Sequence, residues 1–175
     1  EDFEAGTGGW TSVDLSSLRP AYWHIDTYNA YSGNSWWCGA DDPTWFTPPG
    51  FGNYWSQMLV RDINLSSATP PCTLTFMHKY DIEGGNWDNC YVDIYDGSNW
   101  IELANFTGTQ DWSSYNIDIS TWAGSSIKLR YRFGSGSIVS DEDGGYNSDG
   151  AWYIDNIRIY DNNGDIFFDL SLIHI

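Results

Sequence analysis

Three stretches of this chain alternate strictly between apolar side chains and polar or charged ones, and this alternation limits its possible folds. From residue 127 to 133 every second side chain is apolar, and the residues between them are lysine or arginine. Residues 90–95 and 115–119 have the same period. Successive side chains of a strand point to opposite faces of a sheet, so a period of two predicts strands with one buried and one wetted face.

Further strand candidates are rich in aromatic and β-branched residues and are bounded by clusters of Gly, Pro, Asn and Ser. They are residues 10–13, 22–27, 55–63, 73–82, 99–104 and 152–160. Asp96-Gly97 between two candidates predicts a hairpin turn. No amphipathic helix period is present. Roughly nine or ten short strands at this spacing predict an all-β antiparallel sandwich.

The predicted organisation is one domain over residues 1–162, followed by a tail, linker or non-native extension over 163–175. Two long loops, 32–53 and 134–150, interrupt the strands; loops of this length are uncommon unless a ligand or ion orders them. The chain begins Glu1-Asp2-Phe3, without methionine, and shows no leader or membrane-spanning run. We therefore expect a segment of a longer extracellular or cell-surface protein.

The charge is strongly acidic, with 7 Lys and Arg against 24 Asp and Glu, a net charge of −17. Such a surface repels nucleic acid phosphates and anionic membranes, so neither is an expected partner. The hydrophobic fraction of 41% is too high for a disordered chain. Much of the acid is Asp in Gly- and Asn-rich loops, which suits structural calcium. The alternative is a solvated acidic surface.

Two candidate calcium sites follow. Asp155 is in phase with Ile157 and Ile159, so its carboxylate is expected at the core, where a charge needs a partner or a metal. The first and last strands of a sandwich can be neighbours, so Glu4 and Asp155 form the first candidate pair. The alternative is that Asp155 binds a backbone amide at the sheet edge.

The second candidate calcium site lies in the glycine-rich loop 140–150, which carries alternating oxygen donors. Its carboxylates are Asp141, Asp143 and Asp149, and Glu83 and Asp88 from another loop can join them. A solvated acidic loop is the alternative interpretation.

Tryptophan is concentrated in the loop 32–53 and just after it. Exposed Trp rings stack on sugars and anchor interfaces, which makes Trp36, Trp37, Trp45 and Trp55 candidate ligand-binding residues. The alternative, which we favour, is that they fill the open end of the sandwich. A separate basic stripe, Lys128, Arg130 and Arg132, is predicted to form cross-strand ion pairs with Asp93 or Asp118.

No constellation for catalysis is visible. The sequence has no HExxH, GxSxG or phosphate-binding glycine loop. His24 and His78 lie within strand candidates, where a structural role is the usual one. Among the three cysteines, Cys90 is expected to be a buried thiol, and Cys38 and Cys72 are a possible disulfide pair.

Several ordered pieces resemble the MAM-like jelly-roll domains attached to immune-inhibitor-A-type secreted metallopeptidases and to bacterial surface proteins. They are Phe3-Glu4 with Gly9-Trp10, 32–37, 74–83, 88–94, 116–124, 127–133 and 150–157. The resemblance implies a two-sheet jelly roll. Related carbohydrate-binding modules hold a calcium through residues that match Glu4 and Asp155, and the resemblance places Glu83 and Asp88 near a second ion. The family's peptidase residues belong to another domain, and residues 38–53 depart from its compact segment.

The leading functional hypothesis is a non-catalytic, calcium-stabilised accessory domain that contacts neighbouring domains of its own chain and binds a glycan or protein ligand. The alternative is a carbohydrate-binding module that uses the Trp-rich loops. A glycan-cleaving enzyme is the third hypothesis, and it requires two carboxylates facing each other across a cleft.

Overall fold

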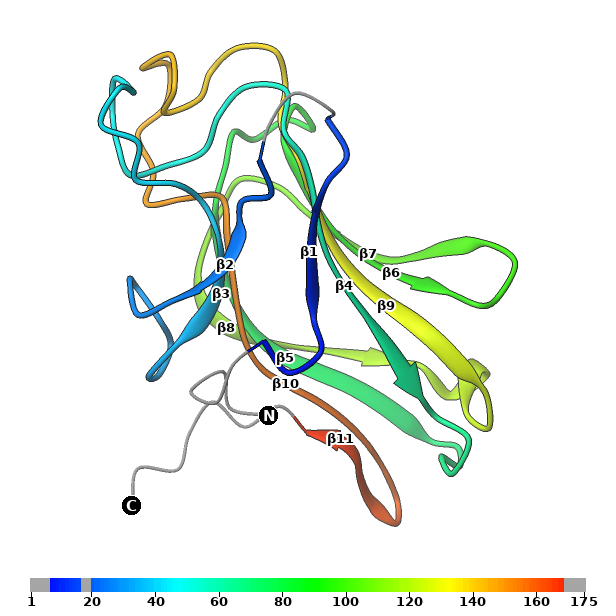
Figure 1. Ribbon diagram of the computed structural model, residues 1–175. Coiled ribbons are helices and arrows are strands. Elements are labelled where there is room, and N and C mark those ends of the chain that lie inside the picture. The colour runs from blue at the N-terminus through cyan, green and yellow to red at the C-terminus, as the bar shows by residue number, and fades with distance from the viewer. Residues whose placement is uncertain (1–6, 17–19, 169–175) are drawn as a thin grey trace.

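The computed structural model describes residues 7–16 and 20–168, and these form eleven strands and one short 3₁₀ helix, Ser120–Trp122. The strands make two antiparallel sheets that face each other (Figure 1). The predicted all-β sandwich of two sheets is therefore confirmed. Within the described residues no helix is long and apolar enough to cross a membrane.

In both sheets the spatial order of the strands differs from their order in the sequence. Sheet A runs β1 (Thr11–Asp14), β4 (Ser56–Asn64), β9 (Ser126–Gly134), β6 (Asn89–Tyr95) and β7 (Trp100–Phe106). Sheet B runs β2 (Trp23–Asp26), β3 (Ser35–Cys38), β10 (Trp152–Asp161), β5 (Cys72–Asp81) and β8 (Thr109–Asp118). Strand β11 (Gly164–Phe168) also pairs with β10, beyond β3 on the same side.

The core forms between the sheets, from the apolar phase of each strand. On β9, Ile127, Leu129, Tyr131 and Phe133 are buried, whereas the lysine and arginines between them face outward. Strand β5 contributes Leu74, Phe76 and His78 in the same way. Burying alternate apolar side chains of both sheets is what stabilises a sandwich.

The predicted hairpin at Asp96-Gly97 joins β6 to β7. The Asp96 carboxylate accepts the amides of Ser98 and Asn99, each at 2.8 Å. Gly97 adopts φ +100°, a conformation that glycine enters without a Cβ clash.

Three expectations about the boundaries change. Strand β3 lies inside the segment expected to be loop, and all four of its residues are buried. Strand β11 lies in the expected tail, so the sheet continues past residue 162. Strand β8 begins at Thr109, ahead of the predicted 115–119 segment; its first half is mostly polar and exposed, so it shows no alternation in the sequence.

All three cysteines are buried and free. Burial raises the pKa of Cys90, as expected of a buried thiol. The partners of Cys38 and Cys72 on β10, Trp152 and Asp161, lie nine residues apart, which is about 30 Å along a strand. A disulfide needs Cα atoms about 6 Å apart, so these two cysteines do not pair.

Candidate functional site

The outer face of sheet A carries an ordered array of aromatic and charged side chains. The register places Tyr91 opposite Arg132, Asp93 opposite Arg130, and Tyr95 opposite both Lys128 and Trp100. In Figure 1 the β6–β7 hairpin bends away from sheet B, so the backbone of sheet A curves toward its outer side. We call the surface formed by Tyr91, Asp93, Tyr95, Trp100, Arg130 and Arg132 the concave face.

A nearly buried carboxylate organises the concave face. Asp93 accepts from Arg130 at 2.9 Å to Nε and 2.8 Å to Nη2, and from Arg132 Nε at 3.4 Å. Lys128 pairs with Asp62 at 2.6 Å. The two arginine pairs are the cross-strand ion pairs predicted with Asp93, whereas the Asp62 partner of Lys128 was not predicted. The alternative partner, Asp118, lies on sheet B and accepts from Ser120 instead, so that part of the prediction is wrong.

Each of the two arginines also covers an aromatic ring. The Arg130 guanidinium carbon lies 3.8 Å from the Trp100 ring centroid, and that of Arg132 lies 3.8 Å from the Tyr91 centroid. The Tyr95 and Trp100 rings are 5.4 Å apart. Stacking on a guanidinium that is itself held by a carboxylate fixes the rings in place. Trp100 remains 37% exposed and available to a ligand.

The concave face leads into a small hollow beside the β6–β7 turn. Its volume is about 180 Å³, and its lining is Asp62, Tyr95, Gly97, Ser126, Ile127 and Lys128. Aromatic surface, planar charged groups and a hollow thus lie together on one face. Rings that stack and planar groups that form paired hydrogen bonds are the elements that recognise a flat, hydroxylated ligand.

The outer face of sheet B is covered by the segment 27–34 instead. Asp149 accepts from the Tyr28 hydroxyl at 3.0 Å and from Asn29 Nδ2 at 2.9 Å. The Tyr153 hydroxyl donates to the Asp149 carbonyl oxygen, and Lys79 Nζ lies 3.8 Å from the Asp149 carboxylate. These polar groups satisfy one another, so Asp149 serves to hold the covering segment.

Asp155 lies beneath this covering and is fully buried. It pairs with Met77 on the outward phase of β10, and a bulge at Asn156, with φ +50°, shifts the phase before Ile157. The prediction that Asp155 faces the core with Ile157 is therefore wrong. Its carboxylate accepts from the Ser35 hydroxyl at 2.9 Å and from the Asn156 amide at 2.7 Å. Glu4 lies outside the described residues.

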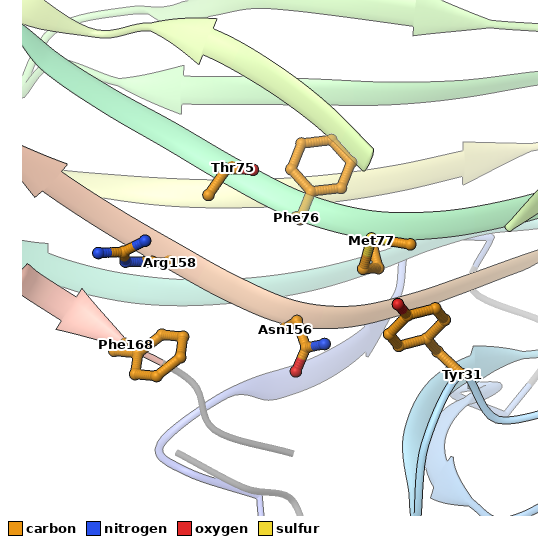
Figure 2. Close-up of a pocket in the computed structure, with 7 residues that line it drawn as sticks. All are labelled: Tyr31, Thr75, Phe76, Met77, Asn156, Arg158 and Phe168. Carbon is orange, nitrogen blue, oxygen red and sulfur yellow. The ribbon is translucent and has the colours of Figure 1, made fainter. Parts of the chain in front are cut away.

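A hollow of about 340 Å³ opens on sheet B beside this bulge (Figure 2). Figure 2 shows Tyr31 at one end and Phe168 with Arg158 at the other, and Asn156 between them. The Arg158 Nε donates to Asp165 at 2.6 Å, and its guanidinium lies 4.6 Å from the Tyr160 ring. Asp165 is exposed, whereas the carboxylate of Asp93 is nearly buried and holds two arginines, so we place the candidate site on the concave face.

The acids of the long loop bind backbone amides. Asp141 is fully buried and accepts from Phe51 N at 2.9 Å, Ser148 N at 2.7 Å and the Ser148 hydroxyl at 2.9 Å. Burial raises the pKa of Asp141 despite these donors. Asp141 therefore ties the loop 39–55 to the loop 135–151.

Asp143 accepts from the amides of Ser140 at 3.0 Å and Gly145 at 2.9 Å and from Asn53 Nδ2 at 2.9 Å. Burial acts to raise the pKa of Asp143, but these hydrogen bonds outweigh it and lower the value to about 2. Over the ranges 7–16 and 20–168, no group of three or more His, Cys, Asp or Glu side chains is arranged to hold a metal. Calcium stays a prediction.

Trp36, Trp37, Trp45 and Trp55 all lie in the interior, at most 8% exposed. Trp55 stacks on Tyr22 with centroids 3.8 Å apart and meets Trp45 at 5.9 Å. Trp36, Trp45 and Trp55 thus fill the sandwich, and Trp37 is covered on the outer face of sheet B, so none of the four rings is presented to a ligand. Sequence reasoning did not single out Trp100, whose exposure depends on the tertiary fold.

The histidines of the strands are structural, as expected. His78 is buried among Phe76, Tyr80 and Phe106, and burial lowers its pKa to about 4, so it is neutral near pH 7. His24 Nδ1 lies 2.9 Å from the Tyr22 carbonyl oxygen.

Solved structures share this fold at low sequence identity. TmCBM61 in complex with β-1,4-galactotriose matches with a TM-score of 0.56 and 15% identity over 91% of this chain and 93% of that one. The CBM28 carbohydrate-binding module, specific for non-crystalline cellulose, matches with 0.55 and 17% over 90% of each chain. The K1 cleaved adhesin domain of Lys-gingipain from Porphyromonas gingivalis W83 matches with 0.59 and 18% over 93% and 96%.

No protein-family model and no curated protein matches the sequence. The structural neighbours, several of which are carbohydrate-binding modules, therefore establish the two-sheet β-sandwich jelly roll as the fold. Neither comparison supports the narrower MAM-like or immune-inhibitor-A assignment.

Proposed function

We propose that this domain binds glycan chains on the concave face of sheet A and does not itself catalyse a reaction. The observation that carries the proposal is the pair of arginine and aromatic stacks, Arg130 with Trp100 and Arg132 with Tyr91, fixed by one buried carboxylate, Asp93. A binding face that is ordered before the ligand arrives loses less entropy on binding. Several neighbours of the same fold are named as carbohydrate-binding modules, which supports the same function.

The charge of the face favours an uncharged glycan. Each cation of β9 already has a carboxylate partner, since Arg130 and Arg132 share Asp93 and Lys128 pairs with Asp62. The net charge of −17 repels polyanions at a distance. Neutral polysaccharides are therefore better candidate ligands than uronate-rich or sulfated ones.

The test is a calorimetric titration of the whole chain with cello-oligosaccharides and β-1,4-galacto-oligosaccharides, with polygalacturonate as the charged comparison. Trp100→Ala should weaken binding of the neutral ligand by about tenfold or more, because it removes the most exposed ring of the concave face. Tyr31→Ala removes an exposed ring from the opposite sheet and should leave the affinity unchanged.

If Trp100→Ala and Tyr31→Ala lower the affinity for the neutral ligand equally, the binding site does not lie on the concave face. If the chain binds none of the neutral glycans of a wider array, the proposed function itself is overturned. Turnover of a bound oligosaccharide would instead favour the glycan-cleaving hypothesis.

The narrower proposal is a calcium-stabilised accessory domain of a secreted or cell-surface protein, next to other domains of the same chain. The buried carboxylate of Asp155, at the position that the resemblance pairs with Glu4, supports it. Calcium bound only by the folded state stabilises it by about 4 kcal/mol at a thousandfold excess over the dissociation constant. Thermal unfolding in calcium and in chelator measures this, and Asp155→Asn should remove the shift. An unchanged melting temperature would contradict the calcium prediction and leave glycan binding intact.

A further inference from the structure

The loop end of the sandwich displays the most exposed large apolar side chains of the described residues. Phe46 is 79% exposed, Trp87 69%, Ile138 67% and Tyr54 66%. They come from three loops that meet at this end. The Tyr54 amide donates to the Gly136 carbonyl oxygen at 2.8 Å, so the loop of Tyr54 lies against the loop of Ile138. Exposed apolar side chains gathered from separate loops usually mark a binding surface.

Two of these side chains border a hollow. It has a volume of about 300 Å³ and is lined by Glu83, Trp87, Gly136, Ser137, Ile138 and Val139. We call it the loop hollow. One side of it, Glu83 and Trp87, comes from the β5–β6 loop, and the other from the loop before β10. Its size is at the lower limit for small-molecule sites, which suits a single ring.

A buried carboxylate ties the two sides of the loop hollow together. Asp88 is fully buried and accepts from Gly136 N at 2.8 Å on one side and from Glu83 N at 3.3 Å on the other. The Thr107 hydroxyl donates to the Glu83 carbonyl oxygen at 3.2 Å and to that of Asp88 at 3.0 Å. These hydrogen bonds support the wall formed by the β5–β6 loop. The walls are thus held in place from below before any ligand binds.

The backbone of the second wall is held in an uncommon conformation. Val139 has φ +73°, a left-handed value that is costly for a β-branched residue. Asp143 fixes it by accepting from Val139 N at 3.1 Å and Ser140 N at 3.0 Å. Such strain persists where the surroundings impose it, and it is concentrated at functional sites.

We propose that the loop hollow is a second ligand site, which takes the terminal sugar residue of a neutral glycan against the Trp87 ring. This proposal rests on the proposed function and extends it. The concave face is open along its strands and fits the interior of a chain, whereas the loop hollow is bounded by two loops and fits a chain end. The Glu83 carboxylate and the Ser137 hydroxyl are the lining groups that can bind sugar hydroxyls.

The experiment uses the whole chain carrying Trp100→Ala, which weakens the concave face and leaves the loop hollow unchanged. Methyl hexosides and the trisaccharide that binds the wild type best are titrated while the indole N–H signals are followed by NMR. The Trp87 indole signal should shift on saturation. Adding Trp87→Ala should weaken the remaining binding by about tenfold or more. Adding Phe46→Ala, which removes an equally exposed ring at the same end outside the hollow, should leave it unchanged.

The outcomes separate the two proposals. If the wild type binds neutral glycans but the Trp100→Ala variant retains no binding, the loop hollow is not a glycan site and the concave face stands. If Trp87→Ala and Phe46→Ala weaken the remaining binding equally, the hollow is likewise excluded. If the wild type binds no neutral glycan, the proposed function and this extension both fail.

Discussion

The two outer faces of the sandwich carry the same kinds of side chain, but on sheet B these are covered and on sheet A they are left open. On sheet B, Trp37 and Tyr153 lie with rings parallel and centroids 6.0 Å apart, and the segment 27–34 covers them. On sheet A, Trp100 and Tyr91 are each stacked by an arginine, and Trp100 stays exposed. The first arrangement builds a second layer of the fold, and the second leaves an ordered surface open to a ligand.

The difference shows that counting aromatic residues does not locate a binding site. What separates the faces is whether the covering segment satisfies the polar groups. Asp149 is occupied by Tyr28, Asn29 and Lys79, whereas Asp93 is occupied and covered by the arginines of its own sheet. Substitutions on each face should therefore separate stability from binding.

The largest expected effect on stability is that of Trp37→Ala. Trp37 is 4% exposed and lies among the rings of His24, Tyr28 and Tyr153. Removing such a buried ring should lower the free energy of unfolding by about 3–5 kcal/mol. Urea unfolding measures this, and glycan affinity of the folded variant should stay at the wild-type value.

Trp100→Ala is the matched variant on the other face, and it should cost only about 1 kcal/mol of stability. Equal losses of stability from Trp37→Ala and Trp100→Ala would show that the two faces do not differ in the way described.

A smaller effect is expected from the ion pairs of the concave face. Asp93 is nearly buried between two arginines, so Asp93→Asn should lower the free energy of unfolding by about 3 kcal/mol, because the arginines lose their counter-charge. Asp62→Asn, which breaks the exposed pair with Lys128, should change it by less than about 1 kcal/mol. Denaturant unfolding of both variants measures the contrast, and a similar small loss from each would contradict a preformed Asp93 centre.

The smallest effect concerns pH at the loop end. Burial raises the pKa of Asp88 from 3.8 to about 6, so its contribution to stability is present below pH 3.8 and is lost as the pH rises through 6. We expect this loss of stability to fall between about pH 4 and pH 7. Asp143 acts in the opposite sense, because its pKa is about 2 and its contribution is lost only as the pH falls toward that value. Thermal unfolding across this range should show a flatter profile for Asp88→Asn, and an unchanged profile would contradict the assignment.

Much of the fold was predictable because its strands alternate regularly. Strands β9 and β6 were found from period two alone, and the pairing of Arg130 and Arg132 with Asp93 was one of the two alternatives predicted from it. Strand β3 was missed because Trp36 and Trp37 are both buried, one by the core and one by the covering segment, so no alternation remains.

The site was less predictable because exposure and local register depend on tertiary structure. The bulge at Asn156 reverses the phase of Asp155 relative to Ile157, and no pattern in the sequence predicts this bulge. The sequence likewise does not distinguish Trp87 from Trp45, although one is 69% exposed and the other 8%. Acids in the long loop suggested a cation, but Asp141 and Asp143 accept backbone amides, as short acidic side chains in loops commonly do.

Strand β10 has a consequence for the synthesis of the chain. It pairs with β3, β5 and β11, so it joins the two parts of sheet B and arrives after nearly every other strand. Until residue 161 leaves the ribosome, β2 and β3 have no link to β5 and β8, and the apolar inner side of that sheet is incomplete. Pairings across such long sequence separations form slowly. We expect a chain truncated before Trp152 to be aggregation-prone. A chaperone that binds the nascent chain should raise the yield of folded protein.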